Sequence, residues 1–260
     1  MMAQMLSKKK RPSRDKHMLK EQLKIEEGVF DRRTIMRIEK MFSHGIISSL
    51  QFLIAKGKEA DVYLAEGGES INEDFVAVKI FRIETSSFYS RTDYMIGDPR
   101  FPKIKKAIFW IVNEWCKKEY GNLRIAAASK VHAPKPYYFN GNVIAIEFLG
   151  SDGRVAPRLK DVVVEEPKQV LKIIISDIKK LYQNELVHAD ISEYNVLIKE
   201  GTPYIIDFGQ AVITKHPNAM AFLKRDVGNI TRYFTRKYRF DANSEGAYDY
   251  VIGKGRTYDL

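Results

Sequence analysis

The residues LVHADISEYNVLI, at positions 186–198, carry the strongest signal in this sequence, and YIIDFGQAV follows them at positions 204–212. Asp190 and Asn195 are five residues apart in the first stretch, and Asp207 comes twelve residues after Asn195 in the second. In each stretch a short polar loop is joined to a strand rich in Val and Ile. This order and spacing are typical of enzymes that transfer a phosphoryl group from a nucleotide.

These residue types suit a nucleotide-bound Mg²⁺ ion, which prefers a few oxygen ligands and keeps several waters. Asn195 would supply a carbonyl and Asp207 a carboxylate to a metal that bridges the triphosphate oxygens. Asp190 would orient the attacking nucleophile and accept its proton. Lys79, which ends the apolar strand VAVK, would pair with the α- and β-phosphates.

Lys79 then needs a carboxylate from a helix to hold its ammonium group. Glu119, in KKEYGNL, is the best placed, and Glu114 on the same predicted helix is the alternative. Each motif alone is weak, because Lys79 could be a strand-edge residue that reaches solvent and His188 could be a structural histidine. Together, the four elements in the required order predict phosphoryl transfer.

The turn in AKGKEADVY should cover the phosphates. If Val62 is aligned with the valine of the kinase pattern G-x-G-x-x-G-x-V, only the middle glycine remains, as Gly57. Ala55 and Ala60 replace the outer two, so fewer backbone N–H groups can approach a phosphate closely. Lys58 could supply charge instead, although a plain hairpin turn would have the same sequence.

The periodicity of the chain predicts a β-rich half, a connector near 147–152 and an α-rich half. We expect helices at 29–44, 105–120, 168–184 and 217–238, two strands with a tight turn within 50–65, and further strands at 75–82 and 135–149. The inner faces of the last two helices should carry Leu171, Ile174, Ile175, Ile178 and Leu181, and Met220, Leu223, Val227, Ile230 and Phe234. Residues 84–104 have no clean period and predict a long mobile loop.

Composition excludes several classes of protein. The single cysteine rules out a disulfide framework and a cysteine-based zinc site. No apolar run approaches the roughly 18 residues of a membrane span, and the Lys-rich start has no apolar segment behind it. We therefore expect a cytoplasmic globular protein.

The net charge of +10 favours a polyanionic partner. Residues 1–20 hold seven Lys and Arg against one Asp, which is +6 of that total. This segment lacks apolar periodicity, so we expect a flexible tail that either keeps the protein soluble or contacts the phosphates of nucleic acid.

The segments GKEADVY, KEYGNL, LVHADISEYNVLI, YIIDFGQAV and HPNA…FLKRDVGNI together resemble the RIO family of atypical serine/threonine protein kinases, over roughly residues 30–240. The short helical region at the start resembles the type-1 branch, and the compact length resembles archaeal members. The resemblance implies an α+β, two-lobed protein-kinase-like fold with an extra N-terminal helix. The expected organisation is a basic flexible tail at 1–28, a helical extension at 29–49, a kinase N-lobe at 50–147 and a truncated C-lobe at 148–260.

The resemblance also implies ATP with Mg²⁺ or Mn²⁺, and a role in maturation of the small ribosomal subunit, with its precursor and rRNA as partners. By position, Lys79 takes the phosphate-pairing role, Asp190 the catalytic role, and Asn195 and Asp207 the metal-binding role. In this family the metal-binding aspartate can itself become a phosphoaspartate, which would make Asp207 catalytic as well.

The resemblance gives the adenine-contacting hinge role to the segment EFLG, chiefly to Glu147 and Leu149. The loop 84–104 matches the flexible loop of the family. Candidate autophosphorylation sites in it are Ser86, Ser87 and Ser90.

Two departures from ordinary protein kinases bear on the substrate. Only 53 residues follow Asp207, with no A-P-E element, so we expect an incomplete peptide-docking platform. Ser192 stands where many protein kinases have a lysine that neutralises the migrating phosphoryl group, so rapid transfer to a hydroxyl should be disfavoured. Both departures favour a slow kinase or an ATPase. The alternatives are a small-molecule phosphotransferase and an RNA-binding assembly factor that uses ATP as a switch.

Overall fold

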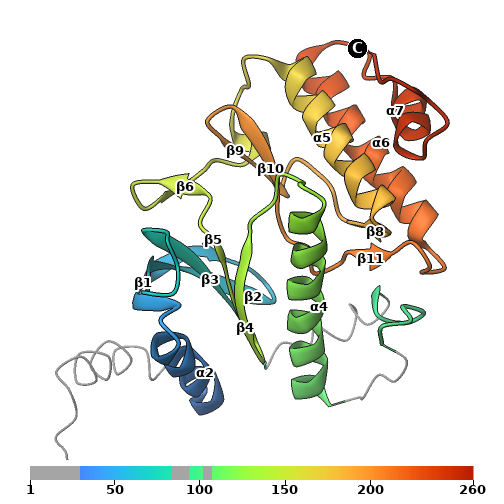
Figure 1. Ribbon diagram of the computed structural model, residues 1–260. Coiled ribbons are helices and arrows are strands. Elements are labelled where there is room, and N and C mark those ends of the chain that lie inside the picture. Colours follow the sequence, from blue (N-terminus) through green and yellow to red (C-terminus); the bar gives the residue numbers. More distant parts are fainter. Residues whose placement is uncertain (1–29, 84–93, 102–106, 260) are drawn as a thin grey trace, which may run out of the picture.

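The computed structural model describes residues 30–83, 94–101 and 107–259, which form a sheet-rich lobe and a helical lobe (Figure 1). The fold is thus α+β, as predicted. The N-lobe is built on a five-stranded antiparallel sheet with the strand order β1-β2-β3-β5-β4. Its strands are β1 (Ile47–Lys56), β2 (Ala60–Gly67), β3 (Phe75–Phe81), β4 (Pro136–Asn140) and β5 (Val143–Glu147). The predicted basic tail and the candidate sites Ser86, Ser87 and Ser90 lie outside the described residues.

The predicted first helix is α2 (Arg32–Ser43), which packs against β1 and β5. Its N-terminus is capped by Asp31, whose Oδ1 accepts hydrogen bonds from the backbone N–H groups of Arg33 and Thr34. Ile38 and Met41 are fully buried against the sheet. The chain leaves the helix through Gly45, whose left-handed φ of +64° suits glycine.

Helix α4 (Ile108–Ala128) packs against β4 and β5 and extends well beyond the predicted end at residue 120. Gly121 lies directly after the predicted end, and glycine weakens helices. In the structure the buried side chains of Leu123 and Ala126 continue the inner face beyond it. Burial of this face outweighs the cost of one glycine, about 1 kcal/mol.

Part of the loop predicted to be mobile is packed. Within 84–104, the segment 94–101 contains Met95 and Asp98, both buried. Asp98 forms an ion pair with Arg100, whose Nη1 also donates to Oδ1 of Asn122 on α4. The sequence of this segment has no hydrophobic periodicity and gave no sign of this packing, because the contacts are with residues distant in the sequence.

The C-lobe packs α5 (Pro167–Gln183), α6 (Ala219–Tyr238) and α7 (Ser244–Val251) against one another. Two small antiparallel sheets, β9 (Val196–Lys199) with β10 (Thr202–Ile205) and β8 (Leu186–Val187) with β11 (Val212–Ile213), frame the polar loops. Between the lobes lie β6 (Gly150–Ser151), β7 (Arg154–Val155) and the 3₁₀ helix η2 (Leu159–Asp161). The predicted inner faces of α5 and α6 are buried, except that Met220 is 41% exposed and Ala219 is buried instead. Helix α7 was not predicted.

Within the described ranges, no helix combines the length and apolar character that crossing a membrane requires.

Candidate active site

A cavity of about 520 Å³ lies where the N-lobe sheet faces the polar loops of the C-lobe. Residues from both lobes line it, so it exists only because the lobes meet. Its N-lobe side includes Gly57, Lys79 and Glu119, and its C-lobe side includes Asn195 and Asp207. The residues predicted to bind the nucleotide, the metal or the acceptor line this cavity, with two exceptions. Asp190 contacts Asn195, which lines it, and Lys58 does not reach it.

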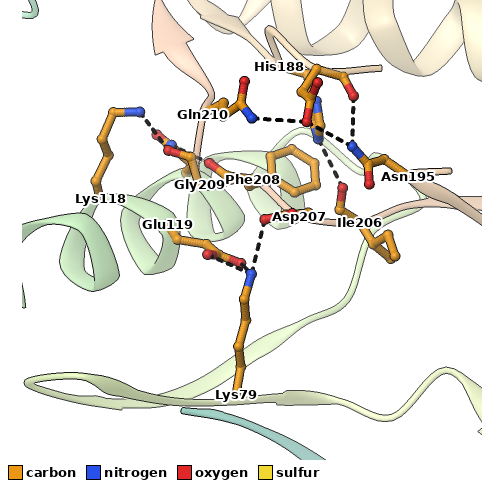
Figure 2. A network of polar contacts seen from close by, with 12 residues as sticks. Lys79, Lys118, Glu119, His188, Asn195, Ile206, Asp207, Phe208, Gly209 and Gln210 are labelled. Carbon is orange, nitrogen blue, oxygen red and sulfur yellow. Dashed lines mark hydrogen bonds and ion pairs between the residues drawn. The ribbon is translucent and has the colours of Figure 1, made fainter. Parts of the chain in front are cut away.

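Lys79 on β3 is bound by two carboxylates from different parts of the chain. Its Nζ lies 2.7 Å from Oε1 of Glu119 on α4 and 3.0 Å from Oδ1 of Asp207 (Figure 2). Burial lowers the pKa of Lys79, but the charges of Asp207 and Glu119 outweigh burial and leave the pKa above its ordinary value. The alternative partner, Glu114, lies instead 4.0 Å from Lys117.

The carboxylate of Asp190 is oriented by two amides. Its Oδ2 accepts hydrogen bonds of 3.0 Å from Nδ2 of Asn195 and from Nε2 of Gln210. Nδ2 of Asn195 also donates to the backbone carbonyl of Asp190, at 2.9 Å. Because Nδ2 of Asn195 faces both acceptors on Asp190, the amide oxygen of Asn195 is directed away from Asp190 and is available to a cation.

Asp207 adopts a left-handed backbone conformation, with φ of +65°, which is uncommon for a residue with a side chain. Its side chain is 51% exposed, in contrast to the buried Glu119. His188 is buried beneath this loop, with Nε2 3.1 Å from the carbonyl oxygen of Ile206 and its ring against Phe208. Burial lowers the pKa of His188 to about 4, so this ring is neutral near pH 7 and serves as a structural contact.

Helix α4 also holds the backbone that follows Asp207. The buried ammonium of Lys118 donates to the carbonyl oxygens of Gly209, at 2.8 Å, and Ala211, at 2.6 Å. Asn122 donates to the carbonyl oxygens of Phe208 and Ala211. Burial and the charge of Arg100, only partly offset by Asp98 and Glu119, lower the pKa of Lys118 to about 7.

Helix α6 holds the backbone on both sides of Asp190. The fully buried carboxylate of Asp226 accepts hydrogen bonds from the N–H groups of Ala189, at 2.7 Å, and Ile191, at 3.0 Å. Arg225 donates to the carbonyl oxygen of Ala189. The loop that carries Asp190 is therefore fixed by a helix that begins almost thirty residues after it.

Sequence reasoning missed Gln210, Lys118 and Asp226 as parts of this site. Gln210 directly follows the DFG segment, which was the only signal for it. Lys118 and Asp226 carried a clearer signal, because each is a charged residue at a position of the inner, apolar face of its helix.

The predicted cofactor contacts are distributed as follows. Gly57, Glu147 and Leu149 line the cavity. A side chain at Gly57 would come within 2.7 Å of the carbonyl oxygen of Ala60, so glycine is required in this turn. Lys58 is exposed and does not line the cavity, whereas Lys56 does, because the turn directs the residue after Gly57 toward solvent.

The residues present suit a nucleotide-bound divalent ion. Asn195 offers an amide oxygen and Asp207 a half-exposed carboxylate. No group of three His, Cys, Asp or Glu side chains within the described ranges could bind a metal by itself. An ion held by Asn195 and Asp207 would therefore take its other ligands from phosphate oxygens and water, which is the arrangement that Mg²⁺ favours.

Comparison with known proteins points to one family. The model of the RIO domain matches residues 61–246. The chain is 40% identical over 233 residues to the RIO-type serine/threonine-protein kinase Rio1 of Haloferax volcanii, covering 90% of this chain and 79% of that protein. It is also 40% identical over 235 residues to the protein of the same name from Methanocaldococcus jannaschii, with the same two coverages.

A solved structure shares the fold. The Rio2 kinase of Chaetomium thermophilum, in an ADP/Mg²⁺-phosphoaspartate complex, is similar with a TM-score of 0.62 at 22% identity. The match covers 83% of this chain and 65% of that one.

Proposed function

Because this chain belongs to the RIO family of atypical protein kinases, in its Rio1-type branch, we propose that it transfers the γ-phosphoryl group of ATP in the presence of Mg²⁺. The acceptors would be serine or threonine hydroxyls. One arrangement carries the proposal: Lys79 is held by Glu119 beside Asp207, across the cavity from the Asp190–Asn195 pair.

Each residue would have a distinct task. The Lys79 ammonium would bind phosphate oxygens, Asn195 and Asp207 would hold Mg²⁺, and the ion would neutralise charge that develops on the phosphates. Asp190, oriented by the Asn195 amide, would accept the proton of the attacking hydroxyl.

Asp207 is a second candidate acceptor. Its half-exposed carboxylate could attack the γ-phosphorus, forming a C–O–P acyl phosphate while the bond from the γ-phosphorus to the β–γ bridging oxygen breaks and ADP leaves. Water would then hydrolyse the acyl phosphate and release inorganic phosphate. The chain would in this way act as an ATPase, which needs no peptide groove. Helix α6 begins only twelve residues after Asp207, which leaves little chain for a peptide-docking segment.

We further propose that the protein acts on the precursor of the small ribosomal subunit and contacts its rRNA, and that it phosphorylates itself within 84–104. The family and the charge of the chain support the first point, since +6 of the net +10 lies in residues 1–20. Ser86, Ser87 and Ser90 remain candidates for the second.

The test is turnover of radiolabelled ATP by the full chain, with and without small ribosomal subunits. We expect Asp190→Asn to lower turnover by about 10²–10⁴-fold, the usual range for losing a general base, and Asp207→Asn to lower turnover as well. Glu69→Gln, which changes an exposed carboxylate that does not line the cavity, is the matched control. Equal activity in all three variants would overturn the enzyme assignment.

The chemistry of any phosphoenzyme separates the two acceptors. An acyl phosphate on Asp207 is cleaved by hydroxylamine, whereas phosphoserine survives it. Label that resists hydroxylamine and persists in Asp207→Asn would exclude Asp207 as the acceptor.

A further inference from the structure

A second hollow lies on the C-lobe and shares no residue with the nucleotide cavity. It has a volume of about 460 Å³ and is called here the α6 groove. One wall is the face of α6 that carries Arg232, Arg236 and Lys237. The other is the catalytic loop at Ser192 and Glu193, two and three residues after Asp190. Three cations against one carboxylate make the groove electropositive.

Two of these cations are available to a ligand. Arg232 donates to Oδ1 of Asn229 at 2.6 Å, and no carboxylate among the described residues pairs with Arg232 or Arg236. Lys237 differs, because its Nζ donates to the carbonyl oxygen of Val162 and to the hydroxyl of Tyr233. Lys237 therefore shapes the groove, and the two guanidinium groups present positive charge in it.

The polar face continues along the helix at a helical spacing and adds one more cation, Arg225, and one neutral amide, Asn229. Arg225, Asn229, Arg232 and Arg236 are separated by four, three and four residues, which sets them on one face of α6. At 1.5 Å per residue this stripe is about 16 Å long. It begins at the catalytic loop, where Arg225 contacts the carbonyl of Ala189. A stripe with three cations suits a ligand that carries several anions along its length.

An exposed aromatic ring stands beside the groove. Tyr194 follows Glu193 directly, and its side chain is 54% exposed. Nζ of Lys160 lies 5.6 Å from the centroid of this ring, and the backbone N–H of Lys160 donates to the carbonyl of Glu193. A positively charged groove flanked by an exposed aromatic ring is the combination that binds single-stranded nucleic acid, in which phosphates meet cations and bases stack on rings.

We propose that the α6 groove binds single-stranded RNA, with phosphates on Arg232 and Arg236 and one base stacked on Tyr194. An unstacked base is needed for the ring contact, which selects a single strand over a duplex. The inference rests on the proposed contact with rRNA and adds the location of that contact. RNA in the α6 groove would lie close to Asp190, because Ser192 lines the groove and is two residues from Asp190.

The test measures binding of a fluorescein-labelled oligouridine RNA of about 12 nucleotides to the full chain by fluorescence anisotropy. The variant R232Q/R236Q is compared with K215Q/K224Q, which removes the same charge from exposed lysines that do not line the groove. We expect about tenfold weaker binding for the groove variant than for the control. The slope of log K against log salt should fall by about 1.4, from two lost contacts at about 0.7 each.

A second pair of variants tests the stacking contact. Tyr194→Ala should weaken binding by about tenfold, whereas Tyr194→Phe keeps the ring and should retain the affinity. Thermal unfolding followed by circular dichroism verifies that each variant is folded.

Three results would overturn the proposal. The groove and control variants could bind RNA equally tightly, which would exclude the groove as the site. The groove variant could instead raise KM for an acidic protein substrate at unchanged RNA affinity, which would make the groove a protein-docking site. Absence of RNA binding by the unaltered chain would refute both this inference and the rRNA contact. The kinase assignment would then still be judged by ATP turnover alone.

Discussion

At the residue scale, the orientation of Asp190 depends on two neutral amides. Asn195 and Gln210 both donate to the same oxygen, Oδ2, and so stabilise the ionised form of the carboxylate without supplying a charge. Asn195 also has a predicted metal-binding role. Gln210 therefore offers the cleaner experiment, since its contact with Asp190 can be altered separately.

We predict that Gln210→Glu raises the pKa of Asp190, because a second carboxylate beside it disfavours the ionised form. The acidic limb of the pH profile of kcat/KM should move to higher pH, since Asp190 must be ionised to accept a proton. Gln210→Met removes the hydrogen bond without adding charge, and it should shift the limb less. Identical limbs in all three proteins would show that Gln210 does not influence Asp190.

The lowered pKa of Lys118 predicts that the stability of the protein depends on pH. Its pKa is lowered from 10.5 in the unfolded chain to about 7 in the folded protein. Between these values the unfolded chain binds more protons, so the free energy of unfolding should rise with pH from about 7 toward 10.

Lys118→Met isolates this effect, because it removes the titrating group while keeping a long side chain. We expect the variant to be less stable overall, because two carbonyls lose a donor, but to lack this rise. Urea unfolding at pH 7 and pH 9.5 measures both quantities. A parallel rise in wild type and variant would mean that other groups cause it.

At the element scale, α4 and α6 support the two loops that carry Asp207 and Asp190. Helix α4 holds Lys79 through Glu119 and the backbone after Asp207 through Lys118 and Asn122. Helix α6 holds the loop around Asp190 through Asp226. In each helix these polar groups lie on the face that is buried against the rest of the protein. A change in how the helix packs would therefore move the loop that these groups hold.

We predict that Asp226→Ala lowers the free energy of unfolding by about 2–5 kcal/mol, because two buried N–H groups lose their acceptor. Asp226→Asn keeps one acceptor oxygen and should lose less. Urea unfolding gives the stability, and ATP turnover should fall in the same order. Full stability in Asp226→Ala would mean that water replaces the carboxylate.

At the scale of the whole molecule, charge and chemistry are separated. The residues with predicted catalytic roles lie in the region after residue 20, where 240 residues carry only +4 of the net charge. The remaining +6 lies in residues 1–20, which are outside the described ranges. The α6 groove is a local cluster of positive charge within this region, whose total charge is nearly balanced.

We predict that deleting residues 1–20 flattens the salt dependence of RNA or subunit binding, because up to seven phosphate contacts are lost. Affinities measured at several salt concentrations give the slope. Basal ATP turnover should remain close to that of the full chain. An equal loss of binding and turnover would mean that the segment belongs to the fold.

The regular elements were largely predictable, and the departures have a common cause. Helices α5 and α6 follow the 3.6-residue period, so their inner faces were predicted apart from Met220. The extension of α4 past Gly121 and the packing of 94–101 depend on contacts with distant segments. A local pattern contains no information on such contacts.

The amino-acid order alone was enough to indicate the family, the α+β class and the residues with predicted catalytic roles, because spacing along loops and strands is a local property. Folding added the relations between distant residues. It selected Glu119 over Glu114 for Lys79, turned Lys58 away from the cavity and brought Gln210 to Asp190. It also set Arg232 and Arg236 beside Ser192 and Glu193. The ion pair of Lys79 with Asp207 joins residues 128 positions apart, and only the packing of the two lobes specifies that such distant residues meet.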